Sequence, residues 1–209
     1  MKPKVLQKTI LRNWQKGSGR SKVIAIAGVQ SGVGVTHSAI LIANFLRRQR
    51  LKVAIVELNG SRHLERIEQA YEGLGFDGVS TEDFKIKGVT YFKHCQKNQL
   101  IERYKLNYDV IILDMGQSLC DYGEDFQMAD LPILIGQTAE WKREELTEFL
   151  IRWQLWIGLR TRWLLPFATE KEVKEFSQGS DQKAYGLGYI HDPFLKSKTI
   201  DQVLEKLFR

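Results

Sequence analysis

One stretch of this chain decides its fold: Ile24-Ala25-Ile26-Ala27-Gly28-Val29-Gln30-Ser31-Gly32-Val33-Gly34-Val35-Thr36-His37. It is an apolar run followed by a glycine-rich turn, and residues 38–46 after it have the composition of a buried helix. A strand that leads into such a loop and a helix N-terminus can hold phosphate, because unpaired backbone N–H groups and the helix dipole favour an anion there. The sequence therefore predicts a phosphate loop, made of Gln30, Ser31, Gly32, Val33, Gly34, Val35, Thr36 and His37.

The side chain that completes such a loop is missing. The P-loop motif, Gly-x-x-x-x-Gly-Lys-[Ser/Thr], uses its lysine to reach the β- and γ-phosphates of a nucleotide. Gly34 and Thr36 occupy their expected positions, but Val35 replaces the lysine and Val29 replaces the first glycine. The loop keeps the backbone composition of a phosphate site and has lost its charge.

The loop resembles that of the MinD/ParA ATPases, the deviant Walker group. Residues 32–37, Gly-Val-Gly-Val-Thr-His, are similar to the Gly-Val-Gly-Lys-Thr-Thr of that family. The resemblance covers about residues 22–209 and implies the fold, with ATP and Mg²⁺ as the ligands of such a site. It also implies a dimer around two ATP molecules, joined by a second, signature lysine early in the loop. Because Gln30 stands at that position and Val35 at the other, both lysines are replaced, which argues against ATPase activity.

A buried strand over residues 108–114 ends in a carboxylate. In P-loop proteins an Asp at the end of such a strand lies beside the phosphate loop and binds magnesium directly or through water. Asp114 and the hydroxyl of Thr36 are therefore the candidate metal ligands, should Mg-nucleotide bind. Gly116 suits a switch whose N–H faces a terminal phosphate.

The other functional positions of the family are altered. The strand over residues 51–58 ends where the family has Asp-x-Asp, which prepares the attacking water. Glu57 keeps one carboxylate and is the one catalytic candidate, whereas Asn59 gives up the second charge. The family's adenine-contacting Asn is also missing, and the resemblance places the base beside Pro166, Phe167, Asp192 and Pro193.

The net charge of +6 is distributed unevenly. Residues 1–56 contain eleven Lys or Arg and no Asp or Glu, so the positive excess lies in the first quarter of the chain. This asymmetry suggests an acidic partner, nucleic acid or an anionic membrane. No apolar run approaches the roughly 20 residues that span a bilayer. Cys95 and Cys120 lack metal-type spacing, so we expect reduced thiols and a cytoplasmic protein.

Residues 1–21 are expected to form a basic amphipathic arm. On a helical wheel one face is apolar and the other basic, comprising Leu6, Ile10, Leu11 and Trp14 against Lys4, Lys8, Arg12 and Lys16. Such a helix can lie peripherally on an anionic membrane or dock in a partner's groove. Packing on its own domain or on a second copy is the alternative. Gly17-Ser18-Gly19 provides a hinge before the domain.

The alternation of strands and helices predicts an α/β domain over residues 22–209. We expect a doubly wound, mostly parallel sheet with helices on both faces, of the P-loop NTPase-like kind. Strands are expected at 22–27, 51–58, 88–92, 108–114, 129–136, 161–165 and 186–190. Helices are expected at 36–49, 61–71, 99–105, 142–156 and 200–208, and irregular structure over 72–87.

Four of the five tryptophans lie close together in the sequence: Trp141, Trp153, Trp156 and Trp163. Their spacing in a helical segment favours core packing. An aromatic docking patch is the alternative, since Trp is enriched at binding hot spots.

Three functions are compatible with these patterns. A working ATPase needs charge stabilisation at the transferring phosphoryl group, and losing one such group commonly costs about 3–4 kcal/mol. Because several such groups are replaced together, we expect a non-hydrolysing MinD/ParA-like scaffold that recruits or positions partner proteins, at the membrane or at a secretion- or pilus-type machine. The alternatives are a weak ATPase and a ParA-like nucleic-acid-associated partitioning protein. The last lacks aromatic–basic interleaving and a helix-turn-helix signal.

Overall fold

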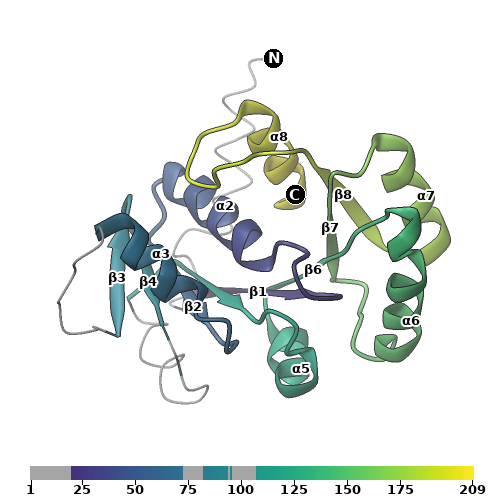
Figure 1. Cartoon of the computed structure of the whole chain (residues 1–209), viewed down its shortest axis with the longest axis horizontal. Coiled ribbons are helices and arrows are strands. Elements are labelled where there is room, and N and C mark those ends of the chain that lie inside the picture. Colours follow the sequence, from purple (N-terminus) through teal and green to yellow (C-terminus); the bar gives the residue numbers. More distant parts are fainter. Residues whose placement is uncertain (1–19, 73–81, 94, 96–106) are drawn as a thin grey trace.

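The computed structural model describes residues 20–72, 82–93, 95 and 107–209. They form an eight-stranded sheet in the order β3-β4-β2-β5-β1-β6-β7-β8 (Figure 1). The β3–β4 pair is antiparallel and every other neighbouring pair is parallel. The predicted α/β class, a doubly wound and mostly parallel sheet, is therefore confirmed.

The elements alternate along the chain. The strands are β1 (Lys22–Gly28), β2 (Val53–Glu57), β3 (Asp83–Ile86), β4 (Val89–Phe92), β5 (Val110–Asp114), β6 (Leu131–Ile135), β7 (Arg162–Pro166) and β8 (Lys183–Leu187). The helices are α2 (Val35–Arg48), α3 (His63–Glu72), α5 (Leu119–Met128), α6 (Arg143–Trp153), α7 (Glu170–Ser180) and α8 (Lys198–Leu207), with a 3₁₀ turn, η2 (Glu140–Lys142), before α6.

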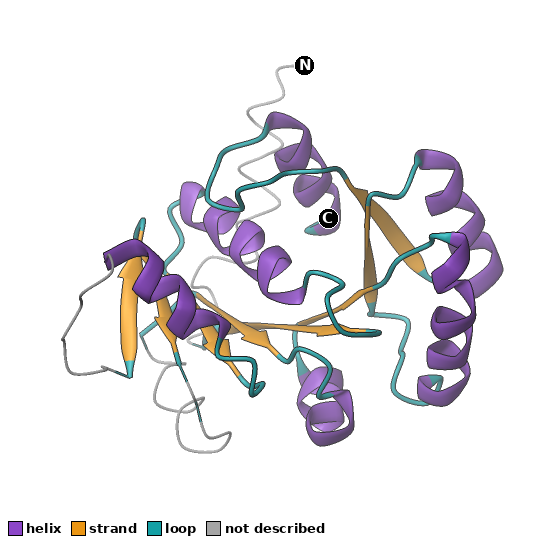
Figure 2. Ribbon diagram, viewed as in Figure 1, coloured by secondary structure: helices purple, strands orange, loops and turns teal. Residues whose placement is uncertain are grey.

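Helices cover both faces of the sheet. The helices α2, α3 and α8 lie on one face, and α5, α6 and α7 lie on the other (Figures 1 and 2). Strands β2, β5 and β6 are buried along their whole length, as their continuous apolar sequences require. Two apolar cores result, one on each side of the sheet.

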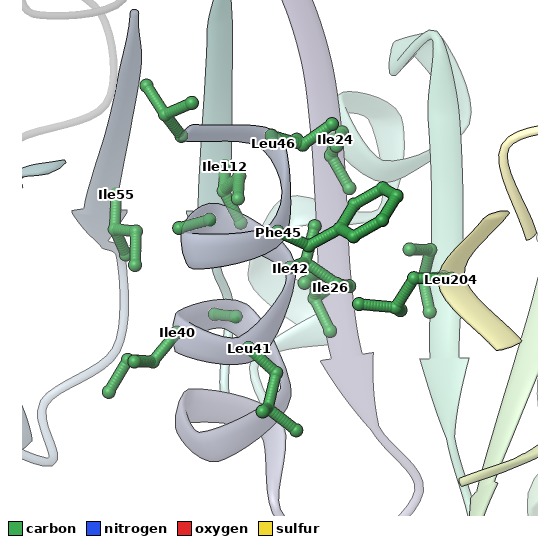
Figure 3. Close-up of a cluster of buried hydrophobic side chains, with 14 of the residues drawn as sticks. Ile24, Ile26, Ile40, Leu41, Ile42, Phe45, Leu46, Ile55, Ile112 and Leu204 are labelled. Carbon is green, nitrogen blue, oxygen red and sulfur yellow. The ribbon is translucent and has the colours of Figure 1, made fainter. Parts of the chain in front are cut away.

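The first core is organised around α2. Phe45 of this helix is fully buried among the side chains drawn in Figure 3. Its ring stacks on that of Phe208, which follows α8. Ile42 of the same helix packs beside Ile24 and Ile26 of β1. Since each such side chain contributes about 1.5–3 kcal/mol on burial, this core fixes the start of α2 relative to the end of β1. It thereby fixes the loop between them.

The structure corrects several predicted elements. Residues 83–86, predicted to be irregular, form the edge strand β3. The last strand comes earlier than predicted, at Lys183–Leu187, and the helices α5 and α7 were not predicted. The predicted arm up to residue 19 and the helix at 99–105 lie outside the described residues.

The tryptophans do not act as one group. Trp163 is fully buried in the second core, whereas Trp141 is 80% exposed on η2. Core packing is thus confirmed for Trp163 and wrong for Trp141. Within the described parts of the chain, the helices are too short or too polar to cross a bilayer.

Candidate functional site

The predicted phosphate loop connects β1 to α2 at the carboxyl edge of the sheet. Gly32 and Gly34 have φ values of +75° and +97°, in the left-handed region that glycine adopts without strain. Gly34 directly precedes α2, and no described side chain caps the first turn of this helix. The first backbone N–H groups of α2 are therefore available to an external acceptor, which is the arrangement that binds phosphate.

Thr36 and Asp114, the candidate metal ligands, are in direct contact. The Thr36 hydroxyl donates to Asp114 Oδ2 at 2.6 Å, and it lies 3.2 Å from Nδ1 of His63. The other carboxylate oxygen, Oδ1, accepts from Asn59 Nδ2 at 2.9 Å and from the Gly116 N–H at 3.2 Å. Asn59 and the predicted switch residue Gly116 thus hold the carboxylate of Asp114, the predicted metal ligand.

Asp114 is fully buried, and its ionisation is unfavourable. Burial raises the pKa of Asp114 to about 6, although the hydrogen bonds from Thr36 and the Gly116 N–H act to lower this pKa. The negative charge of Glu57 acts in the same direction as burial. A carboxylate in this state is poised to gain from a nearby cation.

Glu57 lies at the N-terminus of α3 rather than in the cleft. Its Oε1 accepts from the Ser61 hydroxyl at 3.0 Å, from the His63 N–H at 2.9 Å and from the Leu64 N–H at 3.3 Å. These bonds satisfy backbone donors of the first turn of α3. The side chain predicted as the one catalytic candidate thus anchors a helix in this structure.

The loop and one face of α3 enclose a cleft of about 680 Å³. The predicted loop residues, Asn59, Gly116 and Pro193 line it. So do residues that the sequence analysis did not select, namely Ile40, Ser61, His63, Arg66, Ile67, Ala70, Gln117 and Ser118. Positions 63, 66, 67 and 70 are spaced i, i+3, i+4 and i+7, so helical periodicity was the signal that could have placed them on one face.

A smaller hollow of about 270 Å³ adjoins the loop on its other side. The predicted base-side residues Pro166 and Phe167 line it, together with Tyr189. The Phe167 and Tyr189 rings are 5.9 Å apart, and both are exposed. Asp192 instead accepts from the Phe194 N–H at 2.8 Å and stabilises its own turn.

Val35 is packed beneath the loop. Its side chain is 8% exposed, and a Cβ added to Gly28 would lie 2.8 Å from Val35 Cγ2 and 2.7 Å from Val33 Cγ2. The two valines therefore pack directly on the end of β1. Arg66 on α3 is the one Lys or Arg among the described residues that line the cleft. The loop thus offers an anion backbone donors without a lysine.

The donor set fits magnesium in kind. Mg²⁺ prefers hard oxygen ligands and usually takes few from the protein, the rest being water and substrate phosphate. The Thr36 hydroxyl and the Asp114 carboxylate are such groups. Over the described residues, there is no cluster of three or more His, Cys, Asp or Glu side chains that could hold a metal by itself.

No model of a protein family matches this sequence, and a search of curated protein sequences found no match. Solved structures match nearly the whole chain. MinD, a cell division protein of Aquifex aeolicus, is 14% identical, with 90% of this chain and 95% of that chain covered and a TM-score of 0.66.

Two further solved structures show the same likeness. A plasmid partition protein of Borrelia burgdorferi bound to AMPPNP is 18% identical over 90% of this chain and 96% of its own, with a TM-score of 0.60. A ParA family ATPase from Chlorobium tepidum is 13% identical, with 91% of this chain and 98% of that chain covered and a TM-score of 0.63. At these identities the likeness concerns the fold, and this chain therefore has the P-loop NTPase fold of the MinD and ParA proteins.

Proposed function

We propose that this protein is a non-hydrolysing scaffold with a MinD/ParA-like fold, which recruits or positions partner proteins. The observation that carries the proposal is the packing of Val35 against Gly28 at the position where a P-loop lysine would reach the phosphates. Phosphoryl transfer depends almost entirely on positioning and on charge stabilisation of the transferring group. A loop whose buried side chain at this position is aliphatic lacks the main source of that charge.

The other groups around the loop support the same conclusion. Gln30 replaces the signature lysine, and the Glu57 carboxylate is engaged by α3. Removing one preorganised donor from such a site typically lowers the rate by a factor of about 10² to 10³. With several absent together, turnover should fall to background.

A scaffold needs a surface for its partner. The Aquifex aeolicus MinD, whose fold this chain shares, forms a complex with the protein MinC. By analogy of fold, we infer that this chain binds a protein partner or a second copy of itself, and that the basic arm of residues 1–19 contributes to recruitment, at a partner or at an anionic membrane. The protein would then act in the cytoplasm or at the inner surface of a membrane.

A weak ATPase is the second candidate, and one observation favours it. Thr36 and Asp114 keep the contact that a magnesium site requires, and Arg66 lies across the cleft. These groups could hold Mg-ATP without supplying the missing lysines.

Phosphate release from ATP distinguishes the two candidates. The purified full chain would be assayed with Mg-ATP beside Asp114→Asn, with thermal unfolding as the check that both are folded. The scaffold proposal predicts that both release phosphate at the buffer's rate. Release by the wild type that Asp114→Asn abolishes would overturn it in favour of the ATPase.

A further inference from the structure

The structure gathers part of the unevenly distributed positive charge at one edge of the sheet. Because the central strands are parallel, their first residues share the edge opposite the phosphate loop. Basic side chains precede or begin four of these strands, and we call this set the basic edge: Arg20, Lys22, Arg50, Lys52, Arg160, Arg162 and Lys183. From β2 to β8 the row crosses five strand spacings, or about 24 Å.

Among the described residues, few acids offset this charge. Asp130 pairs with Arg20 at 3.1 Å and with Lys22 at 2.9 Å, and it also accepts the Val23 N–H. Asp109 accepts the Lys52 N–H at 2.8 Å, and Asp181 ends α7 nearby.

The side chains of the other members of the basic edge form no ion pair with a carboxylate in the described part of the chain. Arg160 and Arg162 donate to backbone carbonyls. Arg50, Lys52 and Lys183 form no ion pair with any described residue. The edge therefore keeps a net positive charge.

Exposed aliphatic side chains lie at one end of this edge, and we call them the apolar corner: Met128, Ile151, Leu155 and Leu159. Leu155 and Leu159 are 85% and 86% exposed in the connection from α6 to β7, beside the end of α5 (Figure 1). Gln127 Nε2 donates to the Leu155 carbonyl at 3.0 Å, and Arg160 Nη2 donates to the Gln127 carbonyl at 2.7 Å. These bonds hold the connection against the end of α5, the helix whose last residue is Met128.

The packing of this connection leaves Leu155 and Leu159 exposed. Trp156 lies on Gly123, where an added Cβ would be 2.8 Å from the indole ring, and Ile157 packs on the second core. The Trp156 and Ile157 N–H groups both bond the Trp153 carbonyl, at 2.8 and 3.1 Å. The two anchored residues thus lie between Leu155 and Leu159, whose side chains are left exposed.

We propose that the basic edge and the apolar corner dock together on an anionic membrane surface, with the corner side chains entering the lipid interface. Apolar side chains beside Lys and Arg are what such an interface binds, because lipid headgroups attract the cations and the acyl boundary buries the aliphatic groups. The arm of residues 1–19, which has five basic residues and no acid, joins this edge at Arg20. The proposal extends the scaffold function by naming the surface that holds the scaffold, and it does not depend on nucleotide.

Other occupants fit the surface less well. A second copy would bring the same positive edge against this one, so like charges would oppose a symmetric contact. A nucleic acid would engage the basic edge but leave the aliphatic corner exposed. The combination therefore favours lipid.

Vesicle co-sedimentation of the full chain tests the proposal. Vesicles of phosphatidylglycerol and phosphatidylcholine in equal parts should bind the protein, pure phosphatidylcholine vesicles should not, and about 0.5 M salt should weaken the binding. Leu155→Ser with Leu159→Ser should lower the affinity about tenfold or more, as should Lys52→Gln with Lys183→Gln. The controls Leu195→Ser, and Lys174→Gln with Lys198→Gln, alter exposed residues of the same types elsewhere and should leave the affinity unchanged.

A second measurement keeps the test independent of folding defects. Leu159→Trp should show added quenching by brominated lipid when anionic vesicles are present, and Leu195→Trp should not. The proposal is overturned if the full chain does not bind anionic vesicles, or if the corner and edge variants bind them as tightly as the wild type does. It is also overturned if duplex DNA binds more tightly than vesicles do and the leucine substitutions do not change the affinity for DNA. Phosphate release is read separately, so a failure here leaves the assignment of the cleft untouched.

Discussion

At the scale of single residues, the site is defined by one replacement and one retained contact. Val35 fills the space beneath the loop with an aliphatic side chain, and Thr36 keeps its hydrogen bond to Asp114. The sequence alone predicted both residues as parts of the loop. It could not show that Val35 packs on Gly28, because that contact depends on how the loop folds back over the end of β1.

The buried carboxylate makes stability depend on pH. The pKa of Asp114 in the folded chain is about 6, against an ordinary value of 3.8 for aspartate, so the folded state holds this proton more tightly than the unfolded state does. The Asp114 contribution to the free energy of unfolding therefore falls by about 3 kcal/mol as pH rises from about 4 to above 6.

The Asp114→Asn variant has no carboxyl group to ionise at this position. Its free energy of unfolding, relative to that of the wild type, should therefore increase as pH rises over the same range. Urea unfolding of both proteins at about pH 4.5 and about pH 7.5 measures the gain. A stability difference that is the same at both pH values would contradict the assignment.

At the scale of elements, most strands could be predicted from the sequence, because a continuous apolar run such as that of β5 is typical of a buried strand. The strand β3 was missed although Phe84 and Ile86 alternate with exposed residues, since four residues give too short a pattern to distinguish from a loop. The helix α5 was missed because it contains Gly123 and departs from helical geometry at Tyr122.

The helix α7 buries no residue completely, so hydrophobic periodicity could not reveal it. Its signal was the capping box, in which Thr169 accepts the Glu172 N–H and Glu172 accepts the Thr169 N–H. The cleft residues of α3 were missed for a different reason. Which face of α3 meets the loop is set by its Glu57 anchor and by its packing on the sheet.

A buried ion pair fastens α3 to the end of β4. Lys93 and Glu68 are paired at 1% and 6% exposure of their side chains. Lys93→Met should destabilise the fold by about 3–5 kcal/mol, because it leaves the Glu68 carboxylate buried without its cation. Adding Glu68→Leu should recover most of the loss. Urea unfolding of the single and double variants measures both effects, and a double variant no more stable than the single one would show that the pair is not the cause.

At the scale of the whole molecule, the two opposite edges of the sheet have different chemistry. The carboxyl edge carries the phosphate loop and its cleft, and the amino edge carries the basic residues and the apolar corner. The charge count alone located the excess in the first quarter of the sequence. Only the sheet order shows that Lys52 shares an edge with Arg162 and Lys183, which come from the other end of the chain.

Deleting residues 1–19 tests whether the arm is separate from the domain. The described sheet begins at Lys22, and Arg20 keeps its ion pair with Asp130 in the shortened chain. We expect the truncated protein to be folded and soluble, with weaker recruitment to vesicles or partner. Circular dichroism and co-sedimentation measure these properties. A truncated chain that cannot fold would place the arm in the core and refute the proposed boundary.

Any dimer should form without nucleotide. Gln30 stands where the family's signature lysine would reach the partner's ATP, so ATP has no lysine through which to join two copies. Sedimentation velocity with and without Mg-ATP should therefore give the same distribution of species. A monomer that becomes a dimer only when ATP is added would count against this interpretation of Gln30.

The most direct test of the central claim is a titration of the purified full chain with a fluorescent ATP analogue, with and without magnesium. The claim is that the loop keeps the shape of a phosphate site and lacks its charge. The wild type should therefore bind weakly or not at all, whereas Val35→Lys should bind at least about tenfold more tightly, since a lysine there adds a charge-assisted contact to phosphate. Tight, magnesium-dependent binding by the wild type that Val35→Lys does not improve would contradict the claim.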